Sequence, residues 1–335
     1  MILTKAGADE GDTMYKVIMA PTEGSGSERA AISVAVKLAQ RFDADLHLVR
    51  VDATPVNIEP IPHAPMLMVT EELIREELVA RLQRLEALGT ECRSLGDIRV
   101  RTALEEGPVG PSLRNYANRH DVDLIVISSH ARGGVRRTIL GSVTDYLIRH
   151  TNIPVLVVKQ PASFIGATPK EALSRIIVPL DGSALAEQIL PQVTELALRL
   201  NSAVSLLRVL TPVTYSQQQV MQAGLPWWDI DIESANACLT RAASYLTDKG
   251  LAVSQDVVLG DDVATAVLDY TGRTGADLIA IATRGAGGLS RLTFGTVSDE
   301  VTRMSSKSVL VFHPKQVSAI VNEGERSASE PLAGV

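Results

Sequence analysis

Short runs of aliphatic and β-branched residues alternate with longer segments along this chain. In its first half the runs cover 17–20, 46–51, 99–104, 124–128 and 154–158. Several are apolar at successive positions, which is typical of strands that are buried on both faces. The pattern therefore predicts strands that alternate with helices, and such an alternation favours a parallel, doubly wound sheet with right-handed crossovers.

The segments between the runs have helical patterns. Apolar residues recur at helical spacing over 27–41 and 71–88, so that each segment has one apolar face. Thr70 precedes the second segment and has a side chain that favours the N-cap position of a helix. We therefore expect both segments to be helices that pack on the sheet.

The second half of the chain repeats the first half. The sequence KVIMAPTEGS at 16–25 aligns with RIIVPLDGS at 175–183, and DLIVI at 123–127 aligns with DLIAI at 277–281. Further matched pairs follow in the same order and about 155 residues apart, which chance similarity would not maintain. The repeat predicts two homologous domains.

Changes in composition suggest where the domains begin and end. Glycine and proline interrupt the middle of the chain, four prolines lie within 55–65, and both ends are polar. We expect an extended loop over 55–65. The expected organisation is a flexible N-terminus over 1–13, a first domain over 14–160, a linker over 161–172, a second domain over 173–314 and a flexible tail over 315–335.

Composition and charge restrict the classes of function. Aromatic residues make up only 4% of the chain, so its cores must be aliphatic. The net charge of −7 argues against nucleic acid as the main partner, because binding a phosphate backbone needs a basic surface. No apolar run approaches the roughly 18 residues that span a bilayer, and the N-terminus lacks the apolar core of a signal peptide. A cytoplasmic protein without membrane contact is expected.

Several familiar sites can be excluded from the motifs. Cys92 and Cys238 fall at unrelated places in the two halves and predict neither a disulfide framework nor a metal site. The chain contains no P-loop motif and no His-Glu-x-x-His motif. A dinucleotide fingerprint that starts at Gly24 fails, because Arg29 stands where its third glycine is needed. No residue is assigned a catalytic role.

The residues that follow the first and fourth strands of each domain are candidates for a ligand site. If the five strands take the common order 3-2-1-4-5, the crevice at their carboxyl ends lies between strands one and four. Gly141-Ser142 and Gly295-Thr296 then begin the next helix, where free amides and the helix dipole favour a phosphate. The alternative is that these pairs are ordinary turn glycines followed by N-cap residues, which are common.

At these residues the chain resembles the universal stress protein family, over essentially both domains. Nucleotide-binding members of that family carry an Asp after the first strand and, after the fourth, Gly-x-x-Gly, nine residues and Gly-Ser/Thr. Both copies keep the nine-residue spacing, from Ala131 to Gly141 and from Gly285 to Gly295. The resemblance implies two flavodoxin-like α/β domains with five-stranded parallel sheets, a crevice that holds ATP, alone or with Mg²⁺, and dimerisation through the last strand.

The resemblance also implies a set of site residues in each domain. In the second domain Asp181 is expected on the nucleoside side and Val209 beside the adenine. The full set there is Pro179, Leu180, Asp181, Val209, Ala282, Arg284, Gly285, Gly295, Thr296, Val297 and Ser298. The weaker set in the first domain is Pro21, Thr22, Glu23, Val51, Ser128, His130, Ala131, Gly141, Ser142, Val143 and Thr144.

Departures from the family pattern are more numerous in the first domain. The second domain has Ala282 in place of one glycine. In the first domain Glu23 replaces the Asp, and Ser128 and Ala131 replace both glycines. If a motif glycine has a positive φ, a Cβ there costs roughly 1–2 kcal/mol, or about a tenfold loss of affinity or more. We expect the second domain to bind ATP or a related adenine nucleotide, and the first to bind it weakly or not at all.

Three classes of function remain open. The first is a nucleotide-binding regulatory protein of the stress response, whose hydrolysis of ATP is at most slow because no positioned base or metal-binding carboxylate pair stands out. The second is a scaffold that kept the fold, lost the ligand and serves dimerisation and contact with an unknown protein partner. The third and least favoured is an enzyme, since Asp181 and Glu23 are single carboxylates on separate domains.

The last strands of the two domains are expected to pair with each other. An exposed sheet edge needs a partner or protection, and the strands at 154–158 and 308–312 are similar in sequence. The expected result is a pseudo-dimer within one chain. A homodimer is the alternative.

Overall fold

In the computed structural model, the described residues are 13–24, 26, 28–52, 71–129, 140–159, 173–211, 227–283 and 294–314. The predicted loop over 55–65, the linker over 161–172 and the tail over 315–335 lie outside them, as do Thr70 and the first 12 residues. None of the described helices is long and apolar enough to cross a membrane.

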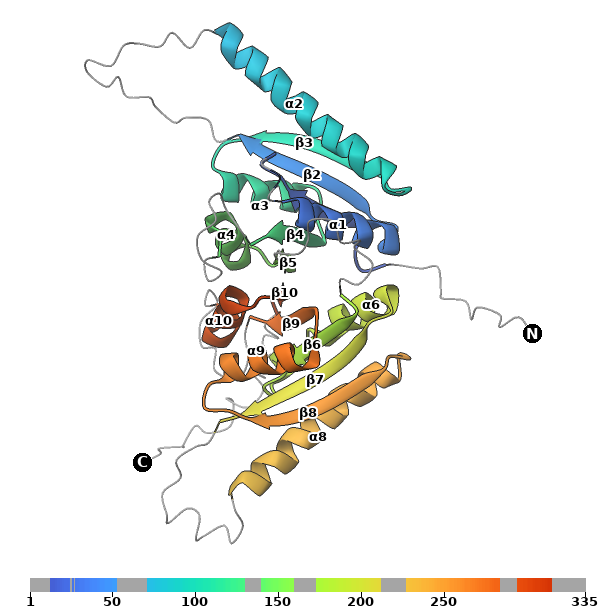
Figure 1. The fold of residues 1–335 in the computed structure, drawn as a ribbon, viewed down its shortest axis with the longest axis vertical. Coiled ribbons are helices and arrows are strands. Elements are labelled where there is room, and N and C mark those ends of the chain that lie inside the picture. The colour runs from blue at the N-terminus through green and yellow to red at the C-terminus, as the bar shows by residue number, and fades with distance from the viewer. Residues whose placement is uncertain are drawn as a thin grey trace, which may run out of the picture.

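The described strands form one continuous sheet in the order β3-β2-β1-β4-β5-β10-β9-β6-β7-β8 (Figure 1). The first half contributes β1 (Val17–Pro21), β2 (Asp45–Asp52), β3 (Val100–Glu106), β4 (Leu124–Ser128) and β5 (Val155–Val158). The second half contributes β6 (Arg175–Pro179), β7 (Ala203–Leu210), β8 (Val253–Leu259), β9 (Leu278–Ala282) and β10 (Ser308–Phe312). The predicted order 3-2-1-4-5 is confirmed in the first half. The second half has the same order when it is counted from the opposite edge.

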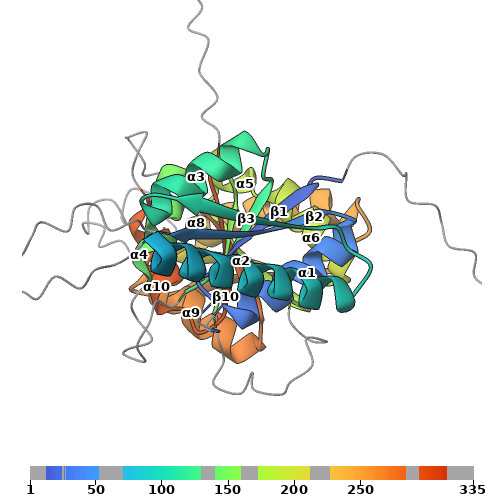
Figure 2. The same cartoon turned by 90° about the horizontal axis from the view of Figure 1, so that it is seen from above.

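Helices cover both faces of the sheet (Figure 2). In the first half α1 (Arg29–Phe42) and α2 (Glu71–Ser94) lie on one face, and α3 (Val109–Arg119) and α4 (Ser142–His150) lie on the other. The second half has α5 (Ala184–Glu187), α6 (Leu190–Leu200), α8 (Trp227–Thr247), α9 (Val263–Thr274) and α10 (Thr296–Met304). The helix predicted over 71–88 is thus present and continues to Ser94.

Matching local signals end the first long helix of each half. Asp43 follows α1 with a φ of 51°, and Asn201 follows α6 with a φ of 55°. Asp and Asn tolerate this left-handed conformation better than most residues, and it lets their amides bond back to the helix. Because each helix ends at a left-handed residue, the two helices have similar connections to the next strand.

The pairing of β5 with β10 joins the two parallel sheets. The two strands run antiparallel, with Val157 opposite Val309, Leu156 opposite Leu310 and Val155 opposite Val311. The expected pairing of the last strands is therefore confirmed, and it occurs within one chain. It removes the sheet edge that each five-stranded unit would otherwise expose.

The hydrophobic core continues across this seam. One cluster of buried residues lies on the α1, α2, α6 and α8 face, and it contains Leu156 and Leu310 together with residues of both halves. A second cluster lies on the α3, α4, α9 and α10 face and contains the valines of the two paired strands. Because both clusters span the seam, we expect the two halves to unfold together.

Replacing a leucine in the seam tests this coupling. Leu310→Ala removes a fully buried side chain and should lower the free energy of unfolding by about 2–5 kcal/mol. Leu198→Ala, at a leucine that is 48% exposed, should change it by less than about 0.5 kcal/mol. Urea denaturation measures both values. Two separate transitions, with only one of them shifted by Leu310→Ala, would contradict a shared core.

Lys159, which follows β5, is the basis for a second prediction. Its side chain is 8% exposed and its Nζ donates to the backbone oxygen of Arg303 across the seam at 3.4 Å. Burial, with a smaller contribution from the Arg303 charge, lowers the pKa of Lys159 from 10.5 to about 8. Between these two values the unfolded chain binds more protons than the folded chain, so stability should rise with pH in that interval.

Lys159→Met should therefore raise the free energy of unfolding at pH 7 by about 1–3 kcal/mol. The gain should shrink as the pH rises from about 8 to about 10.5, because the unaltered protein itself gains stability there. Lys249→Met, at an exposed lysine, is the control. Denaturation curves at several pH values give the result, and a constant difference between the unaltered protein and Lys159→Met would count against this account.

Candidate functional site

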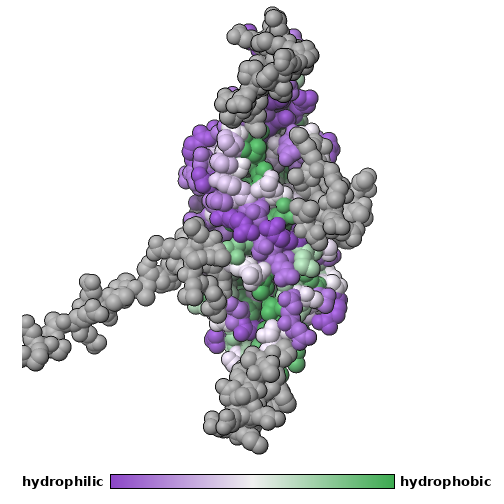
Figure 3. Space-filling view, turned by 90° about the vertical axis from the view of Figure 1, so that its left-hand side faces the viewer, coloured by the Kyte–Doolittle hydropathy of each residue, from purple (hydrophilic) through white to green (hydrophobic). Residues whose placement is uncertain are grey.

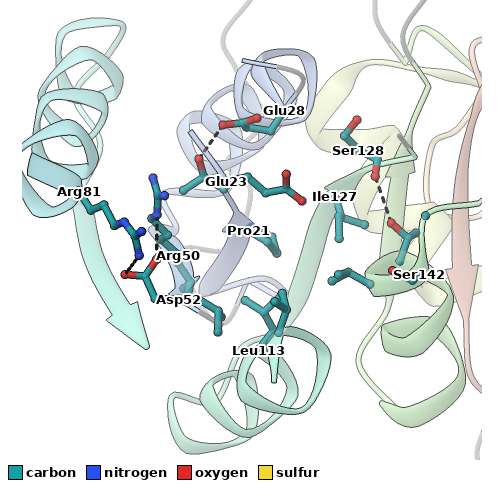
Figure 4. A pocket seen from close by; sticks show the side chains of 17 residues that line it. Pro21, Glu23, Glu28, Arg50, Asp52, Arg81, Leu113, Ile127, Ser128 and Ser142 are labelled. Carbon is teal, nitrogen blue, oxygen red and sulfur yellow. Dashed lines mark hydrogen bonds and ion pairs between the residues drawn. The ribbon is translucent and has the colours of Figure 1, made fainter. Parts of the chain in front are cut away.

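A cavity of about 500 Å³ opens at the carboxyl ends of β1 and β4 in the first half (Figure 4). This is the crevice that the strand order predicts. Its lining includes the first-domain residues expected from the sequence, apart from two: Pro21, Thr22, Glu23, Val51, Ser128, Gly141, Ser142, Val143 and Thr144. The two others, His130 and Ala131, lie outside the described residues.

Two chemically different regions make up the wall of this cavity. Val49 and Val51 from β2, Leu113 from α3 and Ile127 from β4 provide an aliphatic surface. The first turn of α4, with Ser142, lines the cavity beside Ile127 (Figure 4). A ligand with a flat apolar part and an anionic part would match both regions.

Glu28, which the sequence analysis missed, fixes the loop that follows β1. Its Oε1 accepts a hydrogen bond from the Thr22 hydroxyl at 2.8 Å and another from the Gly24 amide at 2.8 Å. The carboxylate is 6% exposed, and Gly24 has a φ of +74°, which favours glycine. Glu28 therefore holds the loop in shape. Its place just before α1 was the only signal for it in the sequence.

The first turn of α4 lines the cavity. Gly141 is the N-cap residue, and no side chain among the described residues caps the helix there. The Gly141 amide donates to the Ser129 oxygen at 3.1 Å, and the Thr144 hydroxyl donates to the Ser128 oxygen at 3.1 Å. These bonds anchor the turn to the end of β4. The alternative that Ser142 is an N-cap is wrong, because Ser142 is already the first helical residue.

Arg50, Asp52 and Arg81 line the other end of the cavity. Asp52 accepts hydrogen bonds from the Arg50 Nε at 3.5 Å and lies 2.9 Å from the Arg81 Nη1 (Figure 4). Arg81 lies on α2. The sequence pattern does not predict that this part of α2 packs beside the end of β2. The hydrogen bonds of Arg81 to Glu77 and Asp52 raise its pKa. This end of the cavity is thus polar and has its charges paired.

The second domain has the same backbone frame at its expected site. The Leu180 amide donates to the Leu207 oxygen at 2.9 Å, as Thr22 does to Val49 in the first domain. The Gly295 amide donates to the Thr283 oxygen at 2.9 Å. Pro179 ends β6, Val209 is the penultimate residue of β7, and Ala282 ends β9. Thr296, Val297 and Ser298 form the first turn of α10. Arg284 and Gly285 lie outside the described residues.

Asp181 is fixed by its own loop in the second domain. Its Oδ1 accepts hydrogen bonds from the Ser183 amide at 2.9 Å and the Ser183 hydroxyl at 2.6 Å. Ser183 in turn caps α5. The carboxylate is therefore oriented before any ligand arrives, which favours recognition of hydroxyl or amino donors.

The backbone geometry around the helix-start glycines shows why the second domain has glycine at this position. Gly141 and Gly295 have φ values of −60° and −61°, so neither uses the left-handed region. At Gly295 an added Cβ would lie 2.8 Å from the Thr283 backbone oxygen. Close approach of the two backbone segments, and not a positive φ, is what requires glycine there. The alternative that Thr296 is an N-cap is also wrong. Gly295 is the N-cap, and Thr296 is the first helical residue.

Among the residues that the structure describes, neither a metal-binding cluster nor a cysteine pair accompanies these sites. Within the described part of the chain, no cluster of three His, Cys, Asp or Glu side chains is arranged to hold a metal ion. Cys92 and Cys238 are both buried and free. Burial raises the pKa of the Cys92 thiol to about 11, which keeps it protonated.

Fold and site together define a tandem α/β protein, in which two related five-stranded units are joined through the last strands. A sequence model of the universal stress protein family matches residues 14–159 and again residues 173–313. The chain belongs to the universal stress protein family.

Individual relatives show how far the similarity extends. A universal stress protein from Mycobacterium tuberculosis is 24% identical over 317 residues, which is 90% of this chain and 96% of that protein. One from Methanocaldococcus jannaschii is 30% identical over 154 residues, or 45% of this chain and 86% of that protein. The crystal structure of a universal stress protein from Archaeoglobus fulgidus covers 89% of this chain and 98% of its own, at 15% identity and a TM-score of 0.64. That likeness shows the fold alone.

Two glycine substitutions test the close approach at the second site. Gly295→Ala should lower the free energy of unfolding by about 1–3 kcal/mol, because the Thr283 oxygen must move. Gly272→Ala, within α9, meets no atom within 4 Å and should raise it by up to about 1 kcal/mol. Thermal and urea denaturation measure both effects. Equal effects of the two substitutions would show that Gly295 is an ordinary helix-start residue.

Proposed function

We propose that this protein is a cytoplasmic regulatory protein of the stress response that binds ATP or a related adenine nucleotide, mainly in its second domain. The observation that supports this most is the cavity between the ends of β1 and β4, which has an aliphatic wall and the first turn of α4, where no described side chain caps the helix. The second domain repeats the backbone frame of that site. Membership of the family supports the role in stress response.

The proposed binding mode follows from the two regions of the wall. The phosphates would lie at the start of α10, against the amides of Thr296 and Val297, where the helix dipole favours negative charge. The adenine would lie against the aliphatic side beside Val209. Asp181, held by Ser183, would accept hydrogen bonds from the ribose hydroxyls. Mg²⁺ would accompany the phosphates. Among the described residues, no cluster of three His, Cys, Asp or Glu side chains is arranged to hold the ion.

The first domain is proposed to be the weaker site. Its cavity is formed, but Glu23 is one methylene longer than Asp181 and would crowd the nucleoside. Ser128 and Ala131 replace motif glycines. Its polar end, with Asp52 paired to Arg50 and Arg81, also has no equivalent carboxylate in the second domain, where Leu210 occupies the corresponding position in the strand.

Any hydrolysis of the nucleotide is proposed to be slow. A general base must be free to take a proton from the attacking water. Three carboxylates near the expected sites are already engaged by their own structure: Glu28 by Thr22 and Gly24, Asp52 by Arg50 and Arg81, and Asp181 by Ser183. A binding role fits this arrangement better than an enzymatic one.

A scaffold without a nucleotide is the second candidate. The departures at Glu23, Ser128 and Ala131 favour it for the first domain. In that case the fused sheet would serve to present a surface to a protein partner, and the crevices would stay empty under all nucleotide concentrations.

Calorimetric titration with ATP and Mg²⁺ separates these functions. The unaltered chain should bind about one equivalent with high affinity. Gly295→Asp should weaken this binding by at least about tenfold, because it adds bulk and negative charge at the phosphates. The matched variant Gly141→Asp, at the same position of the first domain, should leave it intact. Two equivalents would mean that the first domain is competent, and no binding would favour the scaffold.

A further inference from the structure

Four charged side chains of α4 and α10 form a closed ring across the seam between the domains. The Arg149 Nε donates to Asp145 of its own helix at 3.0 Å, and its Nη2 donates to Asp299 of the other domain at 2.9 Å. Arg303 mirrors it, with 2.9 Å to Asp299 and 2.6 Å to Asp145. We call these residues, Asp145, Arg149, Asp299 and Arg303, the interdomain charge ring.

The ring lies on the same side of the molecule as both helix starts. Figure 3 shows that side, and hydrophilic residues are concentrated near its centre, between the two domains. The four side chains are 28–34% exposed, so the charges are only partly screened by water. With two positive and two negative charges, the ring is neutral.

Each aspartate lies one helical turn after the glycine of a proposed phosphate site. The Asp145 amide donates to the Gly141 oxygen, and the Asp299 amide donates to the Gly295 oxygen, each at 2.9 Å. Both aspartates therefore lie in the first turn of their helix, where a carboxylate interacts favourably with the positive end of the helix dipole. An unpaired carboxylate at that place would oppose a phosphate at the same helix end.

Arg149 makes one further contact across the seam. Its guanidinium lies over the Phe294 ring, 5.4 Å from the centroid, and Phe294 immediately precedes Gly295. The contact is specific to the second site, because Leu140 stands at the equivalent position before Gly141. A residue of the first domain is thus held against both sides of the second domain's helix start.

We propose that Arg149 and Arg303 are positioning residues that neutralise and hold the two first-turn aspartates, so that each domain completes the phosphate site of the other. This inference rests on the proposed nucleotide binding. It links the two sites through the ring, so that a change of charge within the ring alters the affinity for anionic ligands at the helix starts.

Opposite substitutions in the ring test this role, because both break the same contacts. Arg149→Gln leaves the ring negative and should weaken ATP binding about three- to tenfold at low salt. Asp299→Asn leaves it positive and should strengthen ATP binding about two- to fivefold. Adenosine, which carries no phosphate, should bind each variant as it binds the unaltered chain. Raising the salt concentration should reduce both effects on ATP.

Two further variants serve as controls. The double variant Arg149→Gln, Asp299→Asn is again neutral and should bind ATP nearly as the unaltered chain does. Arg199→Gln is the matched control. Like Arg149, Arg199 bonds to an acidic residue of its own helix, Glu195, and lies over an aromatic ring of the other domain, Phe42. Unlike Arg149, it is remote from the helix starts. It should leave the affinity for ATP unchanged.

The outcomes decide between positioning and a merely structural role. If the ring only holds the domains together, Arg149→Gln and Asp299→Asn should change affinity in the same direction, and ATP and adenosine should be affected alike. Either result would overturn the inference. If the unaltered chain binds adenosine but shows no preference for ATP, the helix starts do not bind phosphate, and the inference fails as well. If it binds neither ligand, the proposed function itself fails.

Discussion

The antiparallel pairing of β5 with β10 is the interaction on which the rest of the structure depends. It joins two parallel sheets into one and carries both hydrophobic clusters across the seam. Each five-stranded unit would otherwise expose a strand edge flanked by apolar side chains, which invites unwanted association. Fusion of two domains in one chain satisfies this constraint without a second copy, because the linked strands meet at a high effective concentration.

The same pairing also determines how α4 and α10 are placed relative to each other. Since α4 and α10 follow the strands next to the seam, their first turns come close enough for side chains of one domain to bond to the other. The positions at the far end of β2 and β7 differ in charge, since Asp52 is paired with Arg81 and Leu210 stands at the corresponding position. A tandem protein can therefore join its two helix starts by shared contacts and still differ between the outer parts of its domains.

Sequence reasoning predicted the features that depend on periodicity and on the repeat. The strand order, the pairing of the last strands and the place of the crevice follow from apolar runs, topology and the sheet-edge argument. It missed Glu28, Arg81 and the interdomain charge ring, because such contacts join elements whose relative position has no signature in the sequence. It assigned Gly295 to a phosphate site or a turn, and the structure adds that a Cβ there would lie 2.8 Å from the Thr283 backbone oxygen. That close approach of two backbone segments has no signature in the sequence.

Hydrogen exchange of the full chain, measured with and without ATP, tests the central claim most directly. The account predicts that ATP slows exchange of the amides at the start of α10, from Gly295 to Ser298, and in the loop from Leu180 to Asp181. Smaller changes are predicted at the start of α4, transmitted through the seam. Protection of neither helix start at saturating ATP would contradict the account.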